Sequence, residues 1–163
     1  MKESFLHYVW QNKLFAQTDL LTTDGQQIEI VDIGKLNSDS GPDFFNAKVK
    51  INDTLWAGNI EIHINASDWH RHNHTTDKSF DTVILHVVKN SDAEIFRADG
   101  EKIPQMILRY PTTIEHKYNH LMLEVKWIPC ANKISEVPSI YISSWKNALL
   151  AERLRQKTEH IQS

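Results

Sequence analysis

Residues 47–64, AKVKINDTLWAGNIEIHI, decide the fold, because polar and apolar side chains alternate on both sides of a turn. Ala47, Val49 and Ile51 alternate with two lysines, which is typical of a half-buried strand. Asn52-Asp53-Thr54 is a turn sequence, and the residues after it return as the second strand of a hairpin. The alternation therefore predicts an antiparallel pair of strands.

The second strand of this hairpin has one apolar face and one polar face. Successive side chains of a strand point to opposite faces, so the isoleucines at 60, 62 and 64 share one of them. Asn59, Glu61, His63 and Asn65 share the other face. We therefore expect Glu61 and His63 to lie side by side, pointing away from the isoleucines.

The segments outside the hairpin predict helices at both ends of the chain and more strands between them. Apolar residues at three- and four-residue steps predict a first helix over about 4–16, with Ser4 as its N-cap. Val83–Val88 is a nearly continuous apolar run, typical of a central strand. The other predicted elements are a strand over 28–33 ending at Gly34, a second hairpin of residues 93–98 and 103–109, a helix over about 112–125, and a long helix from Pro138.

Together these elements predict an α+β fold. We expect a mixed or mostly antiparallel sheet of five or six strands, with an N-terminal helix and C-terminal helices. A length of 163 residues suits one domain with an appendage, so we expect an α/β core over residues 1–111 that carries the site. Residues 112–163 form a helical segment that leads into a further region or mediates self-association.

Composition and charge exclude several classes of protein. The net charge of −3 gives no overall attraction for nucleic acid, which argues against a non-specific DNA coat protein. Cys130 is the single cysteine, so no internal disulfide forms, and we expect a buried, inert thiol in a reducing compartment. No apolar run approaches the roughly 18 residues of a membrane span, so we expect a cytoplasmic protein without a membrane partner.

Two acidic residues of the hairpin region suit a metal site. Asp43 follows Gly41-Pro42 at the start of the first strand, and Glu61-x-His63 lies on the second. These side chains can converge on one face of the sheet. Carboxylates are the ligands that Mg²⁺ or Mn²⁺ prefers, and such an ion activates water and neutralises phosphoryl charge. We therefore expect Asp43 and Glu61 to bind a divalent metal, with His63 as a ligand or a general acid/base.

Pro42-Asp43 and Glu61-x-His63 resemble the motif of the PD-(D/E)xK nuclease superfamily, in which a helix, a strand and a hairpin that carries both acids are followed by a helix and a strand. The segment between Glu61 and the strand at Val83 leaves little room for the second of these helices. The resemblance implies a nuclease-like core, metal-dependent phosphodiesterase activity, and nucleic acid as the partner. His63 stands where the superfamily has lysine, which helps to orient the attacking water. A protonated His63 would replace that lysine, and a neutral His63 would instead bind the metal.

A second group of potential ligands is rich in histidine. Five of the nine histidines fall between His63 and His86. His72-x-His74-x-x-Asp77 has ligand types that suit Zn²⁺, Mn²⁺ or Fe²⁺. The motif resembles the His-x-His-x-Asp of metallo-β-lactamase-type hydrolases, with one residue too many before the acid. The more plausible site combines His63 or His86 with a loop histidine, His72 or His74.

The chain also resembles a family of uncharacterised bacterial domains over most of its length. The resemblance is carried by Gly41–Phe44, Gly58–His63, Asp68–His74, Val83–Val88 and the tail Trp145…Glu152-Arg153-Leu154…Lys157. It implies no activity. Members of the family are usually longer than this chain, so the resemblance implies a fragment.

Three functions remain open from the sequence. The leading hypothesis is the metal-dependent phosphodiesterase. The second is a non-catalytic structural or interaction module, and the third is a zinc-type hydrolase of a small molecule. In the non-catalytic case Glu61 pairs with Lys48 or Lys50 across the hairpin, and His86 is a hydrogen-bonded core histidine.

Overall fold

The computed structural model describes residues 2–123 and 134–162, so Cys130 and the last two residues of the helix predicted over 112–125 lie outside it. The chain forms two compact units, Met1–Tyr118 and Asn119–Ser163. The first contains the sheet and the candidate site.

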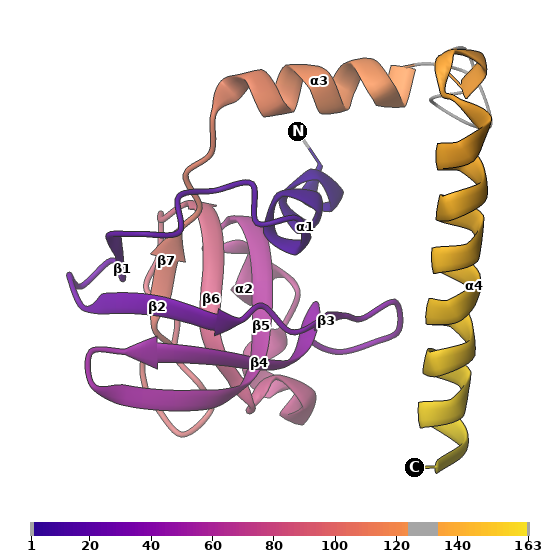
Figure 1. The fold of residues 1–163 in the computed structure, drawn as a ribbon. Helices are drawn as coiled ribbons and strands as arrows, with labels where there is room; N and C mark the ends of the chain where they lie inside the picture. Colours follow the sequence, from indigo (N-terminus) through magenta and orange to yellow (C-terminus); the bar gives the residue numbers. More distant parts are fainter. Residues whose placement is uncertain (1, 124–133, 163) are drawn as a thin grey trace. The chain divides into compact units, whose positions relative to one another are not determined.

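The first unit is built on one seven-stranded sheet, shown in Figure 1. The strand order is β1-β2-β4-β5-β6-β7, and β3 pairs with β4. Pairs are antiparallel from β1 to β5, whereas β5-β6 and β6-β7 are parallel. The strands are β1 Leu20–Leu21, β2 Gln27–Asp32, β3 Lys35–Leu36, β4 Phe44–Ile51, β5 Thr54–Asn65, β6 Val83–Asn90 and β7 Gln105–Ile107. The predicted α+β fold, with its mostly antiparallel sheet, is confirmed.

The helices agree with the predicted order but differ in length. α1 runs over Glu3–Gln11, so the prediction that it continues to residue 16 is wrong. Lys13 has a positive φ of 51°, which leaves the helix, and Leu14 and Phe15 reach the core from the following loop. Ser4 is not the N-cap, because Lys2 takes that position without a side-chain hydrogen bond. The later elements are α2 Asp68–Arg71, the 3₁₀ turns η1 His74–Thr76, η2 Lys78–Phe80 and η3 Ile134–Glu136, and the helices α3 Thr112–Leu123 and α4 Ser139–Gln162.

The hydrophobic core has two parts. Phe5, Leu6, Val9 and Trp10 of α1 are buried in a cluster with the isoleucine face of β5. The second cluster contains Ala66, Trp69 and Phe80 from the segment between β5 and β6, packed with residues of β6 and the loop that follows it. As a result β5 is exposed in its first half but fully buried from Ile60 to His63.

The second predicted hairpin is wrong. Residues 105–107 form β7, which pairs in parallel with β6, and residues 93–98 form no strand. A short antiparallel contact around the predicted Asp99-Gly100 turn is what remains of the pairing. It consists of a bridge between Phe96 and Lys102 and two backbone hydrogen bonds of 2.9 Å, from the Arg97 N–H to the Glu101 carbonyl and from the Ile103 N–H to the Ile95 carbonyl. Strand alternation identifies extended segments but not their partners, and here β6 has a free edge that β7 fills.

The second unit contains α4, a helix of 24 residues. The residues predicted for its apolar side, Trp145, Leu149 and Leu154, are exposed. Within the described parts of the chain, no helix combines the length and apolar character needed to cross a membrane.

Gly58 of β5 provides a test of the close packing between β5 and β6. A Cβ atom at this position would lie 2.4 Å from Ile84 Cγ2 and 2.5 Å from the Thr82 carbonyl oxygen. We therefore expect Gly58→Ala to lower the free energy of unfolding by about 1–3 kcal/mol in urea denaturation. The exposed neighbour Ala57 provides the control, because Ala57→Ser should change it by less than about 0.5 kcal/mol. Equal stability of the two variants would contradict this packing.

Candidate metal centre

The polar face of β5 is buried. Glu61 is 5% exposed and His63 is 1% exposed, so neither side chain is solvated. The parallel register places Glu61 beside His86 of β6, which is fully buried. Three ionisable side chains therefore lie next to one another out of solvent, where each needs a polar partner.

Two more histidines cover this face from the segment that follows β5. His72 is the C-cap residue that follows α2, and His74 begins η1 after Asn73, whose φ is 60°. Asparagine tolerates this left-handed conformation better than most residues. Trp69 and Phe80 hold the segment in place: Trp69 Nε1 donates to Thr75 Oγ1 at 3.0 Å, and the Phe80 ring stacks on His74 with centroids 3.7 Å apart.

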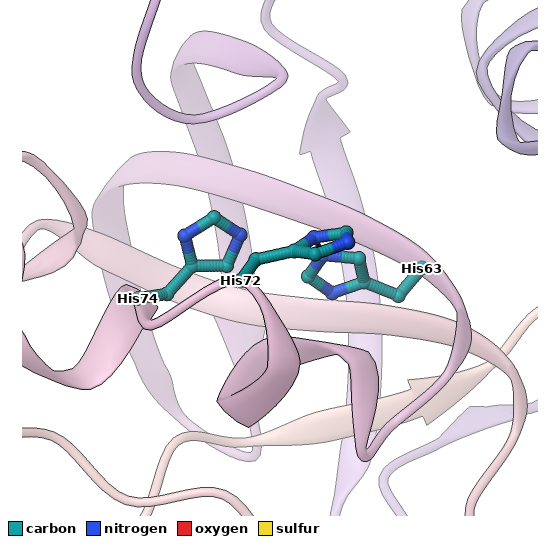
Figure 2. Close-up of side chains that lie close together, drawn as sticks. All are labelled: His63, His72 and His74. Carbon is teal, nitrogen blue, oxygen red and sulfur yellow. Dashed lines mark hydrogen bonds between the residues drawn. The ribbon is translucent and has the colours of Figure 1, made fainter.

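The rings of His63, His72 and His74 converge, as Figure 2 shows. One nitrogen from each ring lies within 4.8 Å of the other two. His63 Nε2 is 3.2 Å from His72 Nδ1. His63 is buried, His74 is half-buried and His72 is exposed, so the group has one side in contact with solvent. We call these three residues the histidine triad.

Glu61 lies against the histidine triad. Its Oε1 is 3.4 Å from His63 Nε2 and 3.3 Å from His74 Nε2. Its Oε2 accepts a hydrogen bond from the backbone N–H of Asp43 at 3.1 Å. These contacts replace the pairing with Lys48 or Lys50 that the non-catalytic hypothesis assigned to Glu61.

Asp43 is placed by an irregularity at the start of β4. The register between β4 and β5 shifts between Phe44 and Ala47, where Asn46 has a φ of 57°. Such a bulge re-aims neighbouring side chains. Asp43 Oδ2 then accepts from the Ile62 backbone N–H at 2.9 Å and lies 3.2 Å from His7 Nε2 in α1. The Asp43 carboxylate is thus directed to His7 and the β5 backbone.

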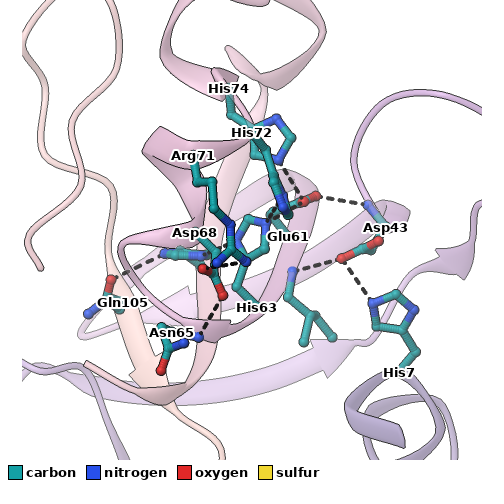
Figure 3. A network of polar contacts seen from close by, with 12 residues as sticks. His7, Asp43, Glu61, His63, Asn65, Asp68, Arg71, His72, His74 and Gln105 are labelled. Carbon is teal, nitrogen blue, oxygen red and sulfur yellow. Dashed lines mark hydrogen bonds and ion pairs between the residues drawn. The ribbon is translucent and has the colours of Figure 1, made fainter. Parts of the chain in front are cut away.

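Behind His63 the network continues to Gln105 of β7. His63 Nδ1 lies 2.8 Å from His86 Nε2, and His86 Nδ1 lies 3.1 Å from Gln105 Oε1. Gln105 is 4% exposed, and its Nε2 donates to Ser91 Oγ at 2.7 Å. Figure 3 shows the side chains that connect His7 to Gln105.

The structure brings the six predicted site residues into one network: Asp43, Glu61, His63, His72, His74 and His86. It leaves His70, which is exposed, and Asp77, which binds Ser79, outside the network. Sequence reasoning missed His7 and Gln105. Neither has a local signal, because each reaches the site from an element distant along the chain.

Burial controls the protonation of the site. Loss of solvation, reinforced by the charge of Asp43, raises the pKa of Glu61 to about 9. Loss of solvation and the neighbouring histidines lower the pKa of His63 to about 2. Burial also lowers the pKa of His86 to about 4 and lowers that of His74. Burial disfavours the charged form of His7 too, but the hydrogen bond and charge of Asp43 raise its pKa.

The donor set fits a transition-metal ion. Neutral imidazoles and a carboxylate are the protein ligands of zinc sites, and imidazole also suits Mn²⁺ and Fe²⁺. His74 Nε2 is buried without a well-aligned hydrogen bond, although Glu61 Oε1 is 3.3 Å away. A metal ion would use this nitrogen, which the protein alone leaves unsatisfied.

The raised pKa of Glu61 predicts how the stability of the metal-free protein depends on pH. A carboxyl with a pKa of about 4.5 when unfolded and about 9 when folded holds its proton longer in the folded state. Its contribution is full below about pH 4.5 and is lost as the pH rises to about 9. With chelator present, the free energy of unfolding should therefore fall between about pH 6 and 9.

The Glu61→Gln variant, which cannot ionise, should lack this part of the decline and be the more stable protein near pH 8. Urea denaturation across the pH range measures both proteins. Parallel pH profiles of the two would contradict the buried, protonated state of Glu61.

A family model matches nearly the whole chain. No curated protein and no solved structure matches the sequence significantly. The matching model covers residues 3–163 and is described as a protein of unknown function, DUF2851. The resemblance to a family of uncharacterised domains is thus confirmed, and the chain belongs to the DUF2851 family.

Proposed function

We propose that this protein is a metal-dependent phosphodiesterase whose ion is bound by His63, His72 and His74. The observation that carries the proposal is the convergence of three imidazole nitrogens within 4.8 Å of one another. Three protein ligands with one side open to solvent are typical of catalytic zinc sites, which keep a position for water.

The proposed ion is Zn²⁺ or Mn²⁺ rather than Mg²⁺. Mg²⁺ takes oxygen ligands in octahedral geometry, whereas the histidine triad offers nitrogen. Among the carboxylates predicted to bind metal, Asp43 is directed to His7 and the Ile62 N–H, which leaves Glu61 as the acid beside the triad.

Glu61 is the proposed general base. A bound Zn²⁺ lowers the pKa of its water to about 7, and the positive charge would favour ionised Glu61. His63, His72 and His74 would hold the ion, which would supply an activated water. The Glu61 carboxylate would accept a proton from the attacking water as the new phosphorus–oxygen bond forms and the bond to the leaving oxygen breaks. The proton then passes to the leaving oxygen. Asp43 positions Glu61 through its backbone N–H.

The order of the elements supports a phosphodiester, and nucleic acid in particular, as the substrate. α1 is followed by β2 and by the β4–β5 hairpin, with Asp43 before β4 and Glu61-x-His63 on β5. α2 and β6 follow, and β6 pairs in parallel with β5. This is the order for which the sequence resembles the PD-(D/E)xK nucleases. This likeness is an analogy of the arrangement of elements, so hydrolysis assays must identify the substrate.

Elemental analysis and hydrolysis assays test the proposal together. We expect about one Zn²⁺ or Mn²⁺ per chain in the tag-free protein, and cleavage of bis(p-nitrophenyl) phosphate and linear DNA with that ion. Glu61→Gln should lower the rate at least about 100-fold. His72→Ala/His74→Ala should lose the ion.

His70→Ala is the matched control, because His70 lies in the same segment but is exposed and outside the triad. It should retain metal and activity. Metal retained by the double variant, or lost equally by the His70 control, would contradict the assignment.

A non-catalytic metal site is the second candidate, and a specific contact favours it. Glu61 Oε1 is near both His63 and His74, so it can serve as a fourth ligand. Four protein ligands would close a tetrahedral site and fasten the segment 68–80 to β5, as in structural zinc sites.

Thermal unfolding distinguishes these two candidates. Binding raises stability by RT ln(1 + [L]/Kd), so a tight structural ion adds several kcal/mol. If the site is structural, removal of the ion should lower the Tm by more than about 10 °C, and no hydrolysis should accompany the loaded protein. If the site is catalytic, hydrolysis should appear only with the ion bound. A loaded protein with neither effect would contradict both candidates.

A further inference from the structure

The orientation of the Gln105 side-chain amide is fixed by one of its two partners, a backbone carbonyl. Its Nε2 lies 2.7 Å from Ser91 Oγ and 3.4 Å from the Ala93 carbonyl oxygen. A carbonyl oxygen accepts and never donates, so the amide nitrogen must face Ala93. Gln105 Oε1 therefore faces His86 Nδ1, at 3.1 Å.

This orientation determines which nitrogen of His86 carries the proton. An amide oxygen can only accept, so His86 Nδ1 must be the donor. His86 is fully buried, where an imidazolium is costly, so the ring carries a single N–H. His86 Nε2 is then left with a lone pair, and it lies 2.8 Å from His63 Nδ1.

His86 in turn determines which nitrogen of His63 carries the proton. Because His86 Nε2 accepts, His63 Nδ1 must donate to it, and the neutral His63 ring has its lone pair on Nε2. His63 Nε2 is the atom that lies 3.2 Å from His72 Nδ1 and 3.4 Å from Glu61 Oε1. The lone pair of His63 is therefore directed into the group of ligands before any ion binds.

We infer that Gln105, acting through His86, is a positioning residue that fixes the Nδ1–H tautomer of His63 and so prepares Nε2 as a metal ligand. The metal part of this inference rests on the proposed function, whereas the tautomer does not. Outer partners of this kind orient ligating histidines and raise their basicity, and their loss lowers metal affinity by about 10- to 100-fold. Neither Gln105 nor His86 needs to touch the ion.

The residues of the histidine triad therefore differ in how firmly their tautomers are fixed. His63 is held by buried partners, whereas His72 is exposed and can change its tautomer or turn its ring without disturbing the core. In the metal-free state His72 Nδ1–H can donate to His63 Nε2 at 3.2 Å. Binding of an ion through these two nitrogens would require the neutral His72 ring to carry its proton on Nε2 instead, so His72 is the ligand that adjusts and His63 the one that is fixed.

Long-range ¹H–¹⁵N NMR of the imidazole rings reads the tautomers directly in the full-length, metal-free protein. The His63 and His86 signals are assigned with the His63→Gln and His86→Gln variants. We expect both rings to be neutral near pH 7, with the proton on Nδ1 and an unprotonated Nε2. A proton on His63 Nε2 in the unmodified protein would overturn the inference, whether or not the protein binds metal.

The Gln105→Met variant removes the acceptor and retains a side chain of similar length. Without that acceptor His86 is free to place its proton on Nε2, so His63 should show a mixture of tautomers. The zinc affinity, measured by competition with a chromophoric chelator, should fall at least about tenfold. Ile107→Val, on the same strand but paired with Val88 where Gln105 is paired with His86, is the control for general loosening and should leave the tautomer of His63 unchanged.

The outcomes separate the inference from the proposed function. A His63 Nδ1–H tautomer that is lost in Gln105→Met supports the inference even if zinc does not bind, and the failure of binding then counts against the metal site alone. An unchanged His63 tautomer in Gln105→Met would overturn the role of Gln105. If the variant does not fold, as judged by its amide spectrum, the tautomers of the unmodified protein still decide the matter.

Discussion

The burial of Glu61 and His63 on the polar face of β5 is the constraint on which the rest of the site depends. A buried ionisable group needs a partner or must give up its charge. Here α1 and the segment between β5 and β6 close both faces of the strand, so neither side chain reaches bulk water. The contacts of Asp43, His86 and Gln105 follow from that requirement. Each of them satisfies a group that water would otherwise solvate.

Local patterns predicted most of the fold, because alternation and helical spacing reflect which side of an element is buried. The hairpin of residues 47–64 and the central position of Val83–Val88 both follow from such patterns. The second hairpin is shorter than predicted, because residues 105–107 pair with the open edge of β6 and only a short contact around Asp99-Gly100 remains. The first helix ended early, because Leu14 and Phe15 reach the core from a loop with the spacing expected of a helix.

The part of the candidate site that follows from strand alternation was predictable from the sequence. Glu61 and His63 share a face through the period of two, and Asp43 begins the partner strand. The density of histidines in this segment made His72 and His74 candidate ligands. The sequence did not show that the turn at Asn73 brings both rings to His63. His7 and Gln105 were not predictable, because the packing of α1 and the parallel pairing of β7 bring them to the site. Long-range packing leaves no periodic trace in the sequence.

We have proposed that this member of the DUF2851 family binds one transition-metal ion through the histidine triad. Anomalous diffraction at the zinc edge, from crystals of the zinc-loaded protein, tests this proposal most directly. We expect an anomalous peak about 2.0–2.1 Å from one nitrogen of each of His63, His72 and His74. A peak on other residues would contradict it. So would crystals at saturating zinc in which the three imidazoles have no peak between them.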